Sequence, residues 1–399
     1  MKLLIAIPAL NEEQSIASIV ERCLEARPHI VANSPINEVE ITVVSDGSTD
    51  RTVEIASNYK GKINLLVFEK NRGYGAAIKE AWSRSDADVL GFLDADGTCD
   101  PLFFADLCMT LDKEQADVVL GCRLNPKSQM PLVRKIGNII FATMLTALSS
   151  TRVKDTASGM RVVRRESLPK LMPLPDGLQF TPAMSARAIL SDELKITEID
   201  MPYCEREGES KLRAGKDGLR FLKAIWSTAY LYRPSRPQGF LALLFLLAAV
   251  TLMISPVFHY LAHRSLKEWM IYRFVVSHLL GMASCLLFCT SYISRRIVKI
   301  TLSASQNPKA PETLLETFFG SRLFWYVPLA LSLAGGILVW PSFVDLVRTG
   351  HVYEHWSRFI AMSFFLSVAF ILSISKLVAY ALDLIDQRMR YLRGPKQKG

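Results

Sequence analysis

The sequence predicts an α/β domain with a mostly parallel sheet, followed by a region of four transmembrane helices. Two observations predict this division: apolar runs of strand length alternate with helical patterns up to residue 205, and four long apolar stretches follow residue 238. Half of the 399 residues are apolar, and the mean hydropathy is +0.21. A chain this apolar is unlike an ordinary soluble enzyme, which supports a membrane region.

The predicted domain alternates strands with helices, as parallel pairing with right-handed crossovers requires. Short, continuous apolar runs are typical of strands that are buried on both faces. They predict strands at Lys2–Ile7, Val39–Val44, Ile63–Phe68, Val89–Leu93, Asp117–Leu120 and Lys195–Met201. Helical patterns predict helices at Ile16–Leu24, Arg51–Tyr59, Ala76–Ser83, Pro101–Lys113 and Pro182–Leu190.

Polar loops follow the first four predicted strands. They comprise Pro8–Glu13, Ser45–Asp50, Asn71–Gly75 and Asp94–Asp100. Each loop by itself is also compatible with an ordinary turn or helix cap. Open α/β sheets bind ligands at the carboxyl ends of their strands. Four such loops at one sheet edge therefore predict a ligand site.

Asp94 and Asp96 lie two residues apart, directly after the apolar run Val89–Leu93. Two carboxylates at the end of a buried strand can share one divalent cation. Mg²⁺ or Mn²⁺ takes few protein oxygens and leaves coordination sites for substrate phosphates. The pair therefore predicts a metal that binds a diphosphate leaving group, and a solvated Asp-rich turn is the alternative.

Two further segments of the domain carry candidate functions. Apolar residues recur at helical spacing between Pro131 and Val153, which fits a helix on a bilayer surface and equally a core helix. Asp155–Arg161 joins a carboxylate, small residues and a guanidinium. This segment is compatible with a phosphate clamp and with a capped turn.

Residues 206–237 form a basic juxtamembrane segment, within which Gly208–Lys211 has the composition of a shaped loop. The net charge of the chain is +9, but no nucleic-acid motif is present. The basic residues therefore predict anionic lipid or a phosphate-bearing substrate as partners, with no nucleic acid. The seven cysteines form no Cys-x-x-Cys pair, and no signal peptide is recognisable, which predicts free thiols in the cytoplasm.

The transmembrane region spans residues 238–384, with predicted helices at about 239–261, 274–293, 323–347 and 359–382. Each is long enough to cross the hydrocarbon core of a bilayer. The loop with Arg295 and Arg296 and the basic tail, residues 385–399, are richer in Lys and Arg than the opposite loops. This bias predicts an integral membrane protein with both termini in the cytoplasm. Lys376, inside the last segment, is expected to snorkel or to face the bundle.

Taken together, the motifs resemble family 2 inverting glycosyltransferases, which have a Rossmann-like GT-A nucleotide-sugar domain. The branch that the chain resembles most is that of dolichol-phosphate mannose synthase and bacterial polyprenyl-phosphate glycosyltransferases. The resemblance covers about residues 1–235. It is carried by Pro8–Glu12, Val44–Asp50, Asn71–Gly73, Asp94–Asp96, Asp155–Arg161 and Arg206–Lys211, in family order.

The resemblance implies a bacterial inner-membrane enzyme that moves a hexose from a UDP- or GDP-sugar to a polyprenyl phosphate lipid, with inversion. Mg²⁺ or Mn²⁺ is the implied cofactor, held by Asp94 and Asp96, and a homo-oligomer is compatible with the family. The implied nucleotide-sugar residues are Pro8, Ala9, Asn11, Glu12, Asp46, Asn71, Arg72, Gly73, Asp94, Ala95 and Asp96. Those around the acceptor phosphate are Arg123, Ser158, Arg161, Arg206 and Lys211, and the catalytic set is Asp94, Asp96, Arg161, Arg206 and Lys211.

The sequence departs from the family pattern in four places. Ser45 replaces a frequent Asp, Tyr74 a frequent Lys, and Thr98 a Gln of the metal shell in some members. Phe180–Pro182 lacks a carboxylate, which argues against a side-chain base there.

Three other functions remain open from the sequence. A processive polysaccharide synthase is disfavoured because the chain has no Gln-x-x-Arg-Trp motif. A synthase that transfers sugar to a lipid hydroxyl and a non-catalytic membrane protein with a retained sugar-nucleotide fold are the other two.

Overall fold

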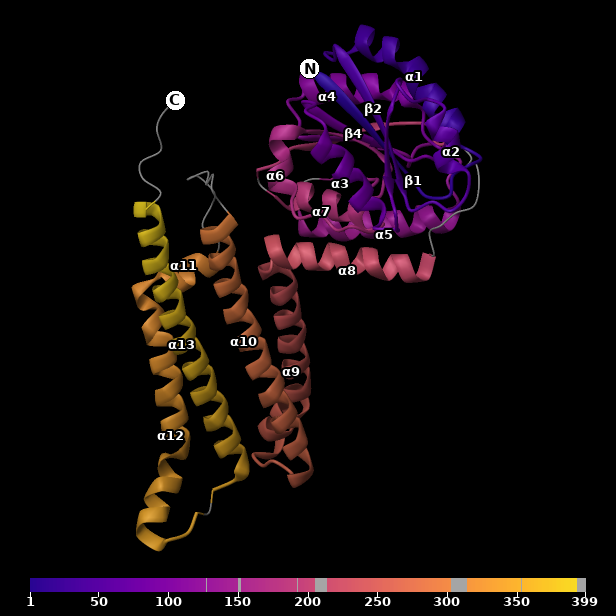
Figure 1. Cartoon of the computed structure of the whole chain (residues 1–399). Helices are drawn as coiled ribbons and strands as arrows, with labels where there is room; N and C mark the ends of the chain where they lie inside the picture. Colours follow the sequence, from indigo (N-terminus) through magenta and orange to yellow (C-terminus); the bar gives the residue numbers. More distant parts are fainter. Residues whose placement is uncertain are drawn as a thin grey trace. The chain divides into compact units, whose positions relative to one another are not determined.

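The computed structural model describes residues 1–392 except 127, 150–151, 192, 205–213, 303–313 and 353. The chain divides into two compact units, Met1–Tyr232 and Arg233–Gly399 (Figure 1). The predicted basic juxtamembrane segment, residues 206–237, extends across this division. The predicted domain boundaries at residues 205, 237 and 384 stay predictions.

In its described part, the first unit contains a seven-stranded sheet in the order β3-β2-β1-β4-β6-β5-β7. The strands are β1 Lys2–Ala9, β2 Glu38–Asp46, β3 Asn64–Phe68, β4 Val89–Leu93, β5 Val118–Cys122, β6 Met160–Arg164 and β7 Ile196–Asp200. Only β6 among these strands runs antiparallel to its neighbours, β4 and β5. The other described pairs are parallel.

Helices cover both faces of this sheet. They are α1 Ile16–Asn33, α2 Thr52–Ser57, α3 Tyr74–Arg84, α4 Phe104–Lys113, α5 Leu132–Leu148, α6 Leu168–Leu171, α7 Phe180–Leu190 and α8 Ala214–Tyr232. Successive side chains of a strand point to opposite faces. Leu3 and Ile5 of β1 therefore join a core with α1 and α4, whereas Leu4 joins a core with α3 and α7. Burial on both faces explains why β1 is apolar throughout.

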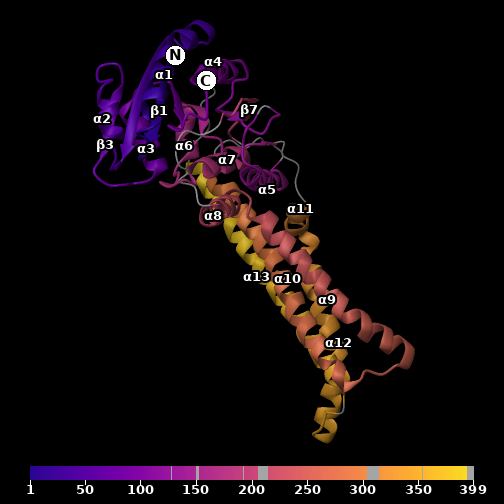
Figure 2. The ribbon, with the colours of Figure 1, turned by 90° about the vertical axis from the view of Figure 1, so that its right-hand side faces the viewer.

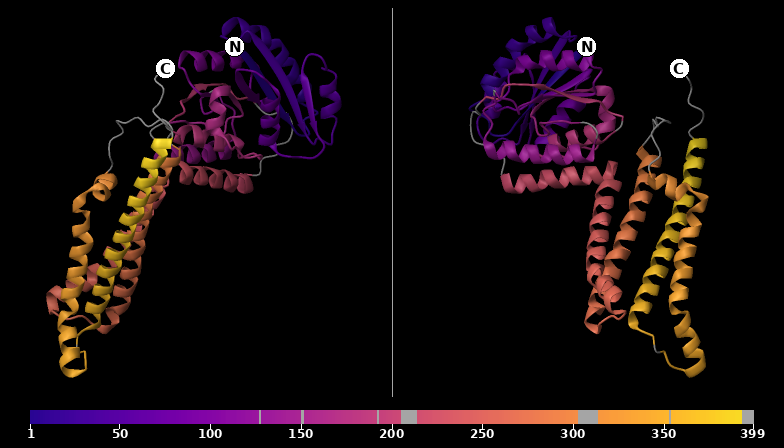
Figure 3. Two further views of the ribbon diagram at one scale, coloured as in Figure 1. Left: turned by 60° about the vertical axis from the view of Figure 1, so that its left-hand side comes forward. Right: turned by 180° about the vertical axis from the view of Figure 1, so that it is seen from behind.

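Helices α5 and α8 lie side by side in the first unit (Figures 1 and 3). Helix α8 begins at Ala214 and carries part of the basic run that the sequence predicted to be a juxtamembrane flank. The flank is thus helical from Ala214 to Tyr232. Because lysines and arginines are interspersed with its apolar residues, the sequence indicated only a basic flank and no amphipathic helix here.

The predicted fold class is confirmed, and each of the six predicted strands overlaps an observed one. The strand that the sequence did not predict is β6. It contains Arg161 and Arg164, so it is not a continuous apolar run. Arg161 is nevertheless fully buried, because its charge is satisfied by hydrogen bonds inside the protein.

The second unit is built from long helices, most clearly seen in Figure 2. They are α9 Ser235–His263, α10 Ile271–Leu302, α12 Tyr326–Thr349 and α13 Trp356–Leu392, with the short α11 Leu314–Gly320 between α10 and α12. Within the described residues, four helices are long and apolar enough to cross a membrane, and they contain the four predicted segments.

Lys376 faces other parts of the second unit, which is one of the two predicted placements. Its Nζ donates a hydrogen bond to the Phe319 carbonyl oxygen of α11 and lies 5.6 Å from the ring centre of Phe324. The carbonyl group and the aromatic face therefore stabilise the charge within an apolar helix bundle.

Candidate active site

A cavity of about 690 Å³ lies at the carboxyl ends of β1, β2 and β4 in the first unit. One part of its wall comes from the loops that follow these strands. This part includes Pro8, Ala9, Glu12, Asp46, Asn71, Gly73, Tyr74, Asp94, Ala95 and Asp96. The other part comes from α5, α8 and neighbouring loops, and includes Arg123, Arg134, Val133, Ile136, Ile140, Tyr203, Arg220 and Phe221. The cavity thus brings carboxylates, arginines and apolar side chains together.

Asn11 connects the loop after β1 to the loop after β2 by hydrogen bonds. Its Oδ1 accepts a 2.8 Å hydrogen bond from the backbone N of Thr49, and its own backbone N donates to Ser48 Oγ at 3.1 Å. Its φ of +51° lies in the left-handed region, which Asn tolerates better than most residues. Among the described residues, Asn11 is not part of the cavity wall, whereas its neighbour Glu12 is.

Asp46 fixes the loop Asn71–Gly73. Its carboxylate accepts hydrogen bonds from the backbone N of Arg72 at 2.6 Å and of Gly73 at 2.9 Å. Burial raises the pKa of Asp46, and these two hydrogen bonds oppose the rise. Gly73 has φ +108°, and an added Cβ would lie 2.4 Å from the Asp176 carbonyl oxygen. The Arg72 side chain is exposed and lies over the Phe68 ring, 4.4 Å from its centre, outside the described cavity wall.

Asp94 and Asp96 both line the cavity, as expected from their position after β4. The Tyr74 hydroxyl donates a 2.6 Å hydrogen bond to Asp94 Oδ1. On the other side, a Cβ added to Gly159 would lie only 1.8 Å from Asp94 Oδ2. Asp96 is buried, and its Oδ1 accepts hydrogen bonds from Thr98 Oγ1 at 2.6 Å and Thr98 N at 3.2 Å. Both carboxylates therefore have defined orientations.

The two carboxylates fit a hard divalent cation. Carboxylate oxygens are preferred ligands of Mg²⁺ and Mn²⁺, and Mg²⁺ is typically bound by one or two carboxylates together with substrate phosphates. No cluster of three or more His, Cys, Asp or Glu side chains suited to a metal occurs among the described residues. A cation here would therefore need oxygen ligands from a substrate or from water.

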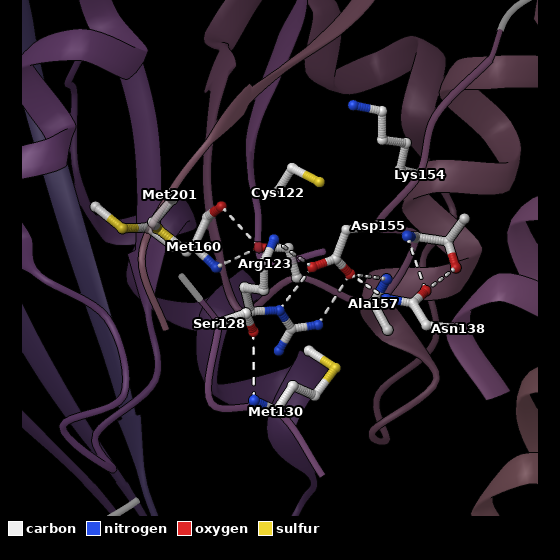
Figure 4. A network of polar contacts seen from close by, with 12 residues as sticks. Cys122, Arg123, Ser128, Met130, Asn138, Lys154, Asp155, Ala157, Met160 and Met201 are labelled. Carbon is white, nitrogen blue, oxygen red and sulfur yellow. Dashed lines mark hydrogen bonds and ion pairs between the residues drawn. The ribbon is translucent and has the colours of Figure 1, made fainter. Parts of the chain in front are cut away.

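Arg123 also lines the cavity, and Asp155 holds its guanidinium group (Figure 4). Arg123 Nε and Nη2 donate to the two oxygens of Asp155 at 2.7 and 2.9 Å, and its backbone N donates at 3.0 Å. Burial raises the pKa of Asp155, but the charge of Arg123 and the hydrogen bonds from Arg123 and Asn138 outweigh this effect and lower it. The pair is therefore ionised at neutral pH, and three hydrogen bonds define its geometry.

Arg161 and Ser158 lie in the protein interior, and neither is part of the described cavity wall. The Arg161 guanidinium donates to the carbonyl oxygens of Ser158 and Thr156 at 3.0 and 2.8 Å, and to Ser185 Oγ at 2.8 Å. Burial lowers the pKa of Arg161 to about 10. In this structure Arg161 thus supports the loop that carries Asp155 and Gly159. Contact of Arg161 and Ser158 with an acceptor phosphate stays a prediction, and Arg206 and Lys211 lie outside the described residues.

Several residues of the cavity wall were not singled out as site residues from the sequence. They include Tyr74, Arg134, Gly159, Thr181, Tyr203 and Arg220. Tyr74 lies within the predicted loop Asn71–Gly75, so its position gave a local signal. The approach of Gly159 to Asp94 depends on the pairing of β4 with β6, which the sequence did not predict.

Helices α5 and α8 present apolar side chains to the surface of the first unit. On α5 these are Leu132, Val133, Ile136, Ile139 and Ile140, and on α8 Leu219, Leu222, Trp226, Tyr230 and Leu231. Contiguous exposed apolar residues on amphipathic helices are typical of a membrane surface or a protein interface. Because α5 also lines the cavity, an apolar surface adjoins the candidate active site.

Comparison with known proteins gives the family. Glycosyl transferase family 2 matches residues 4–172. A dolichyl-phosphate hexose transferase of Haloferax volcanii is 32% identical over 170 residues, which is 42% of this chain and 68% of the relative. A dolichyl-phosphate beta-glucosyltransferase of Drosophila melanogaster is 29% identical over 187 residues, which is 43% of this chain and 57% of the relative.

An undecaprenyl-phosphate 4-deoxy-4-formamido-L-arabinose transferase of Photorhabdus laumondii is 28% identical over 188 residues, with 46% of this chain and 55% of the relative covered. The match therefore spans little more than half the length of these last two relatives. One similar solved structure is that of glucosyl-3-phosphoglycerate synthase of Mycobacterium tuberculosis, in complex with Mn²⁺, UDP and phosphoglyceric acid. It has a TM-score of 0.47 and 20% sequence identity, and the match covers 57% of this chain and 78% of that chain. The dolichyl-phosphate hexose transferase of Haloferax volcanii is matched at 32% identity over more than two-thirds of its length. The chain therefore belongs to glycosyl transferase family 2, as its motifs predicted.

Proposed function

We propose that the chain is a membrane-bound inverting glycosyltransferase that moves a hexose from a nucleotide diphosphate sugar to a polyprenyl phosphate. One observation carries this proposal: a single cavity is lined by the carboxylates Asp94 and Asp96, by Arg123, and by apolar side chains of α5. An activated sugar and a lipid phosphate could therefore meet in one place. The relatives are named as dolichyl-phosphate or undecaprenyl-phosphate transferases, which supports this acceptor class.

On the donor side, Asp94 and Asp96 would hold Mg²⁺ or Mn²⁺, which when bound offsets the negative charge that develops on the leaving diphosphate. Pro8, Ala9 and Glu12 form the cavity wall next to these carboxylates, together with the loop that Asp46 orders. This loop would position the nucleotide through Asn71 and Gly73. Asn11 and Arg72 would not contact the nucleotide. They would hold the loop after β1 and the loop Asn71–Gly73 in place.

On the acceptor side, Arg123 would bind the lipid phosphate. Its position next to Asp155 is fixed, so little reorganisation is needed when an anion binds. Arg134 and Arg220 add positive charge to the same wall. Arg206 and Lys211, which follow in sequence, are proposed to complete this phosphate site.

The transfer needs no protein base in this proposal. A lipid phosphate is largely dianionic near pH 7, since its second pKa is about 6. One phosphate oxygen attacks the anomeric carbon from the face opposite the diphosphate. The bond from that carbon to the diphosphate oxygen breaks, and its electron pair leaves with the nucleoside diphosphate. The protein aligns the reactants and offsets repulsion between two anions.

The acceptor would approach from a membrane. The exposed apolar side chains of α5 and α8 suit the interface between lipid and water, and the four apolar helices of the second unit suit a bilayer. We propose a cytoplasmic location for both termini, on the basis of the Lys and Arg bias, and the bacterial inner membrane as the site. A homo-oligomer is compatible with this arrangement.

The proposal is tested with the full chain in lipid nanodiscs that contain undecaprenyl phosphate. Radiolabelled UDP- and GDP-sugars are added one at a time, with Mn²⁺ or with EDTA. We expect one sugar to appear on the lipid phosphate in a metal-dependent reaction, and Asp96→Ala to abolish transfer. Asp106→Ala, which removes an exposed carboxylate of α4, is the matched control and should keep full activity. Transfer by Asp96→Ala at the wild-type rate, or labelling of a lipid hydroxyl alone, would contradict the proposal.

A further inference from the structure

Asn138 is a buried polar side chain on the inner face of α5. It is 4% exposed, whereas its neighbours Ile139 and Ile140 are 47% and 52% exposed. Asn is a poor helix former, and burial of an amide is unfavourable unless the amide is hydrogen-bonded. The contacts of Asn138 therefore need to be strong enough to offset both costs.

Both ends of the Asn138 amide are engaged. Its Nδ2 donates a 2.5 Å hydrogen bond to Asp155 Oδ1, and its Oδ1 accepts hydrogen bonds from the backbone N and Oγ1 of Thr156 at 3.1 and 3.0 Å. These contacts connect the middle of α5 to the loop that precedes β6 (Figure 4). The orientation of the amide is thus fixed by both partners.

Asp155 also binds Arg123, so it connects Asn138 to that arginine. The same Asp155 carboxylate accepts from Arg123 Nε and Nη2 in a bidentate pair, and Asp155 is fully buried. No hydrogen bond joins Arg123 Nη1 to any residue that the structure describes. Arg123 lines the cavity, and the two N–H groups of Nη1 and the second N–H group of Nη2 are the donors that remain for a ligand there.

We infer that Asn138 is a positioning residue for the acceptor phosphate. It acts through Asp155, whose orientation it fixes, and so determines where Arg123 presents Nη1 to the cavity. The inference rests on the proposed function, because it takes Arg123 to be a ligand of the lipid phosphate. It adds that α5, whose other face is apolar and exposed, is connected to this arginine by two consecutive hydrogen-bonded contacts.

The test measures binding of farnesyl phosphate and, separately, of UDP with Mn²⁺ to the detergent-solubilised full chain by calorimetry. Asn138→Leu removes the amide at similar volume. We expect about tenfold weaker binding of farnesyl phosphate, which is typical for the loss of one hydrogen bond to a charged group, and unchanged binding of UDP. Thr143→Ala is the matched control on α5, because Thr143 is exposed and its hydroxyl bonds only within the helix, to the Ile139 carbonyl oxygen.

A double-mutant cycle separates positioning from a purely structural role. Arg123→Lys retains the charge but loses the bidentate geometry, so Asn138→Leu should weaken binding much less in that background. Asn138→Ala is used in the same cycle if the Leu variant folds poorly, as judged by its Tm. The inference would be overturned if the wild type and both Asn138 variants bound farnesyl phosphate equally well. It would also be overturned if the effects of the Asn138 and Arg123 substitutions on binding were additive.

The inference and the proposed function can fail separately. If the wild type transfers no hexose to undecaprenyl phosphate but the binding differences appear, the proposed function is wrong and the positioning role stands. If transfer occurs at the wild-type rate in Asn138→Leu and Asn138→Ala, with unchanged KM for the lipid, the positioning role is wrong. Failure of the wild type to bind farnesyl phosphate would also overturn it.

Discussion

The hydroxyl group of Tyr74 donates a 2.6 Å hydrogen bond to Asp94 Oδ1, and the Asp94 carboxylate is confined on its other side by Gly159. The Tyr74 ring is held by edge-on contacts with Phe92 and Phe180, each with ring centres 6.4 Å apart. Burial and the charge of Asp94 raise the pKa of Tyr74, so the hydroxyl keeps its proton and remains a donor. Asp94 is therefore oriented before any substrate binds.

Replacement of Tyr74 by Phe tests this orientation. The variant keeps the ring but loses the hydrogen bond to Asp94, and loss of a partner of a metal-binding carboxylate typically weakens metal binding at least tenfold. We expect the Mn²⁺ concentration for half-maximal transfer to rise roughly tenfold. Tyr59→Phe is the control, since the Tyr59 hydroxyl bonds Glu21 on the surface at 2.7 Å. An unchanged Mn²⁺ dependence in Tyr74→Phe would show that Asp94 does not need this contact.

Gly159→Ala tests the close approach on the other side of Asp94. The added Cβ would lie 1.8 Å from Asp94 Oδ2, so the carboxylate has to move. A displacement of about 1 Å in an active site can reduce the rate about a hundredfold, and we expect a loss of this size in kcat/KM. Gly336→Ala, at a position of α12 with nothing within 4 Å of the added Cβ, should leave kcat/KM unchanged. Wild-type kinetics in Gly159→Ala would contradict this account.

Asp155 predicts a pH-dependent contribution to stability. Its pKa is lowered in the folded state, so the unfolded chain binds more protons in acid. The contribution is present above the ordinary aspartate value of 3.8 and is lost as the pH falls through the lower, folded-state pKa. Asp155→Asn leaves Arg123 buried without its counter-charge, a change that typically costs about 3–5 kcal/mol near neutral pH.

Thermal unfolding of the full chain in detergent checks this sign. The difference in Tm between wild type and Asp155→Asn should be largest near neutral pH and shrink as the pH falls below 3.8. Asp106→Asn, on the exposed surface of α4, should show a small difference at every pH. A gap that stays constant down to low pH would mean that Asp155 is not ionised in the folded protein.

The apolar side chains of α5 predict contact with lipid. Ile139 is 47% exposed on this helix. In a Cys204→Ser background, which removes an exposed thiol, Ile139→Cys is labelled with a fluorophore in nanodiscs. We expect strong quenching by spin-labelled lipid, and none at Ser57→Cys on α2, which serves as the control. Equal quenching at both positions would contradict a membrane-facing α5.

Much of the fold was predictable because its signals are local. The buried parallel strands are continuous apolar runs, and the loops with Asp46 and Asp94 follow them directly in the sequence. The same holds for the four long apolar helices, whose length and composition are sufficient. The convergence of the loops at one cavity follows from the parallel arrangement.

The rest depended on contacts between distant parts of the chain. Arg161 reads as a surface or ligand-binding charge, and only the pairing of β6 with β4 shows that it is buried. Asn138 is one polar residue in an apolar helical pattern, and its partners Asp155 and Thr156 belong to another segment. The role of Tyr74 likewise depends on where Asp94 lies after folding. Local periodicity carries no information about such pairs.

The reversed direction of β6 has a consequence for redesign. Leu93, the last residue of β4, pairs with Met160, the first residue of β6, so the end of one strand is fixed against the beginning of the other. If the pairing of β6 with β4 slipped by one residue, every side chain of β6 would turn to the opposite face. Exchanging the segment on only one side of this junction risks such a slip. Chimeras with other family members should therefore transplant Asp94–Asp96 and Asp155–Arg164 as a matched pair.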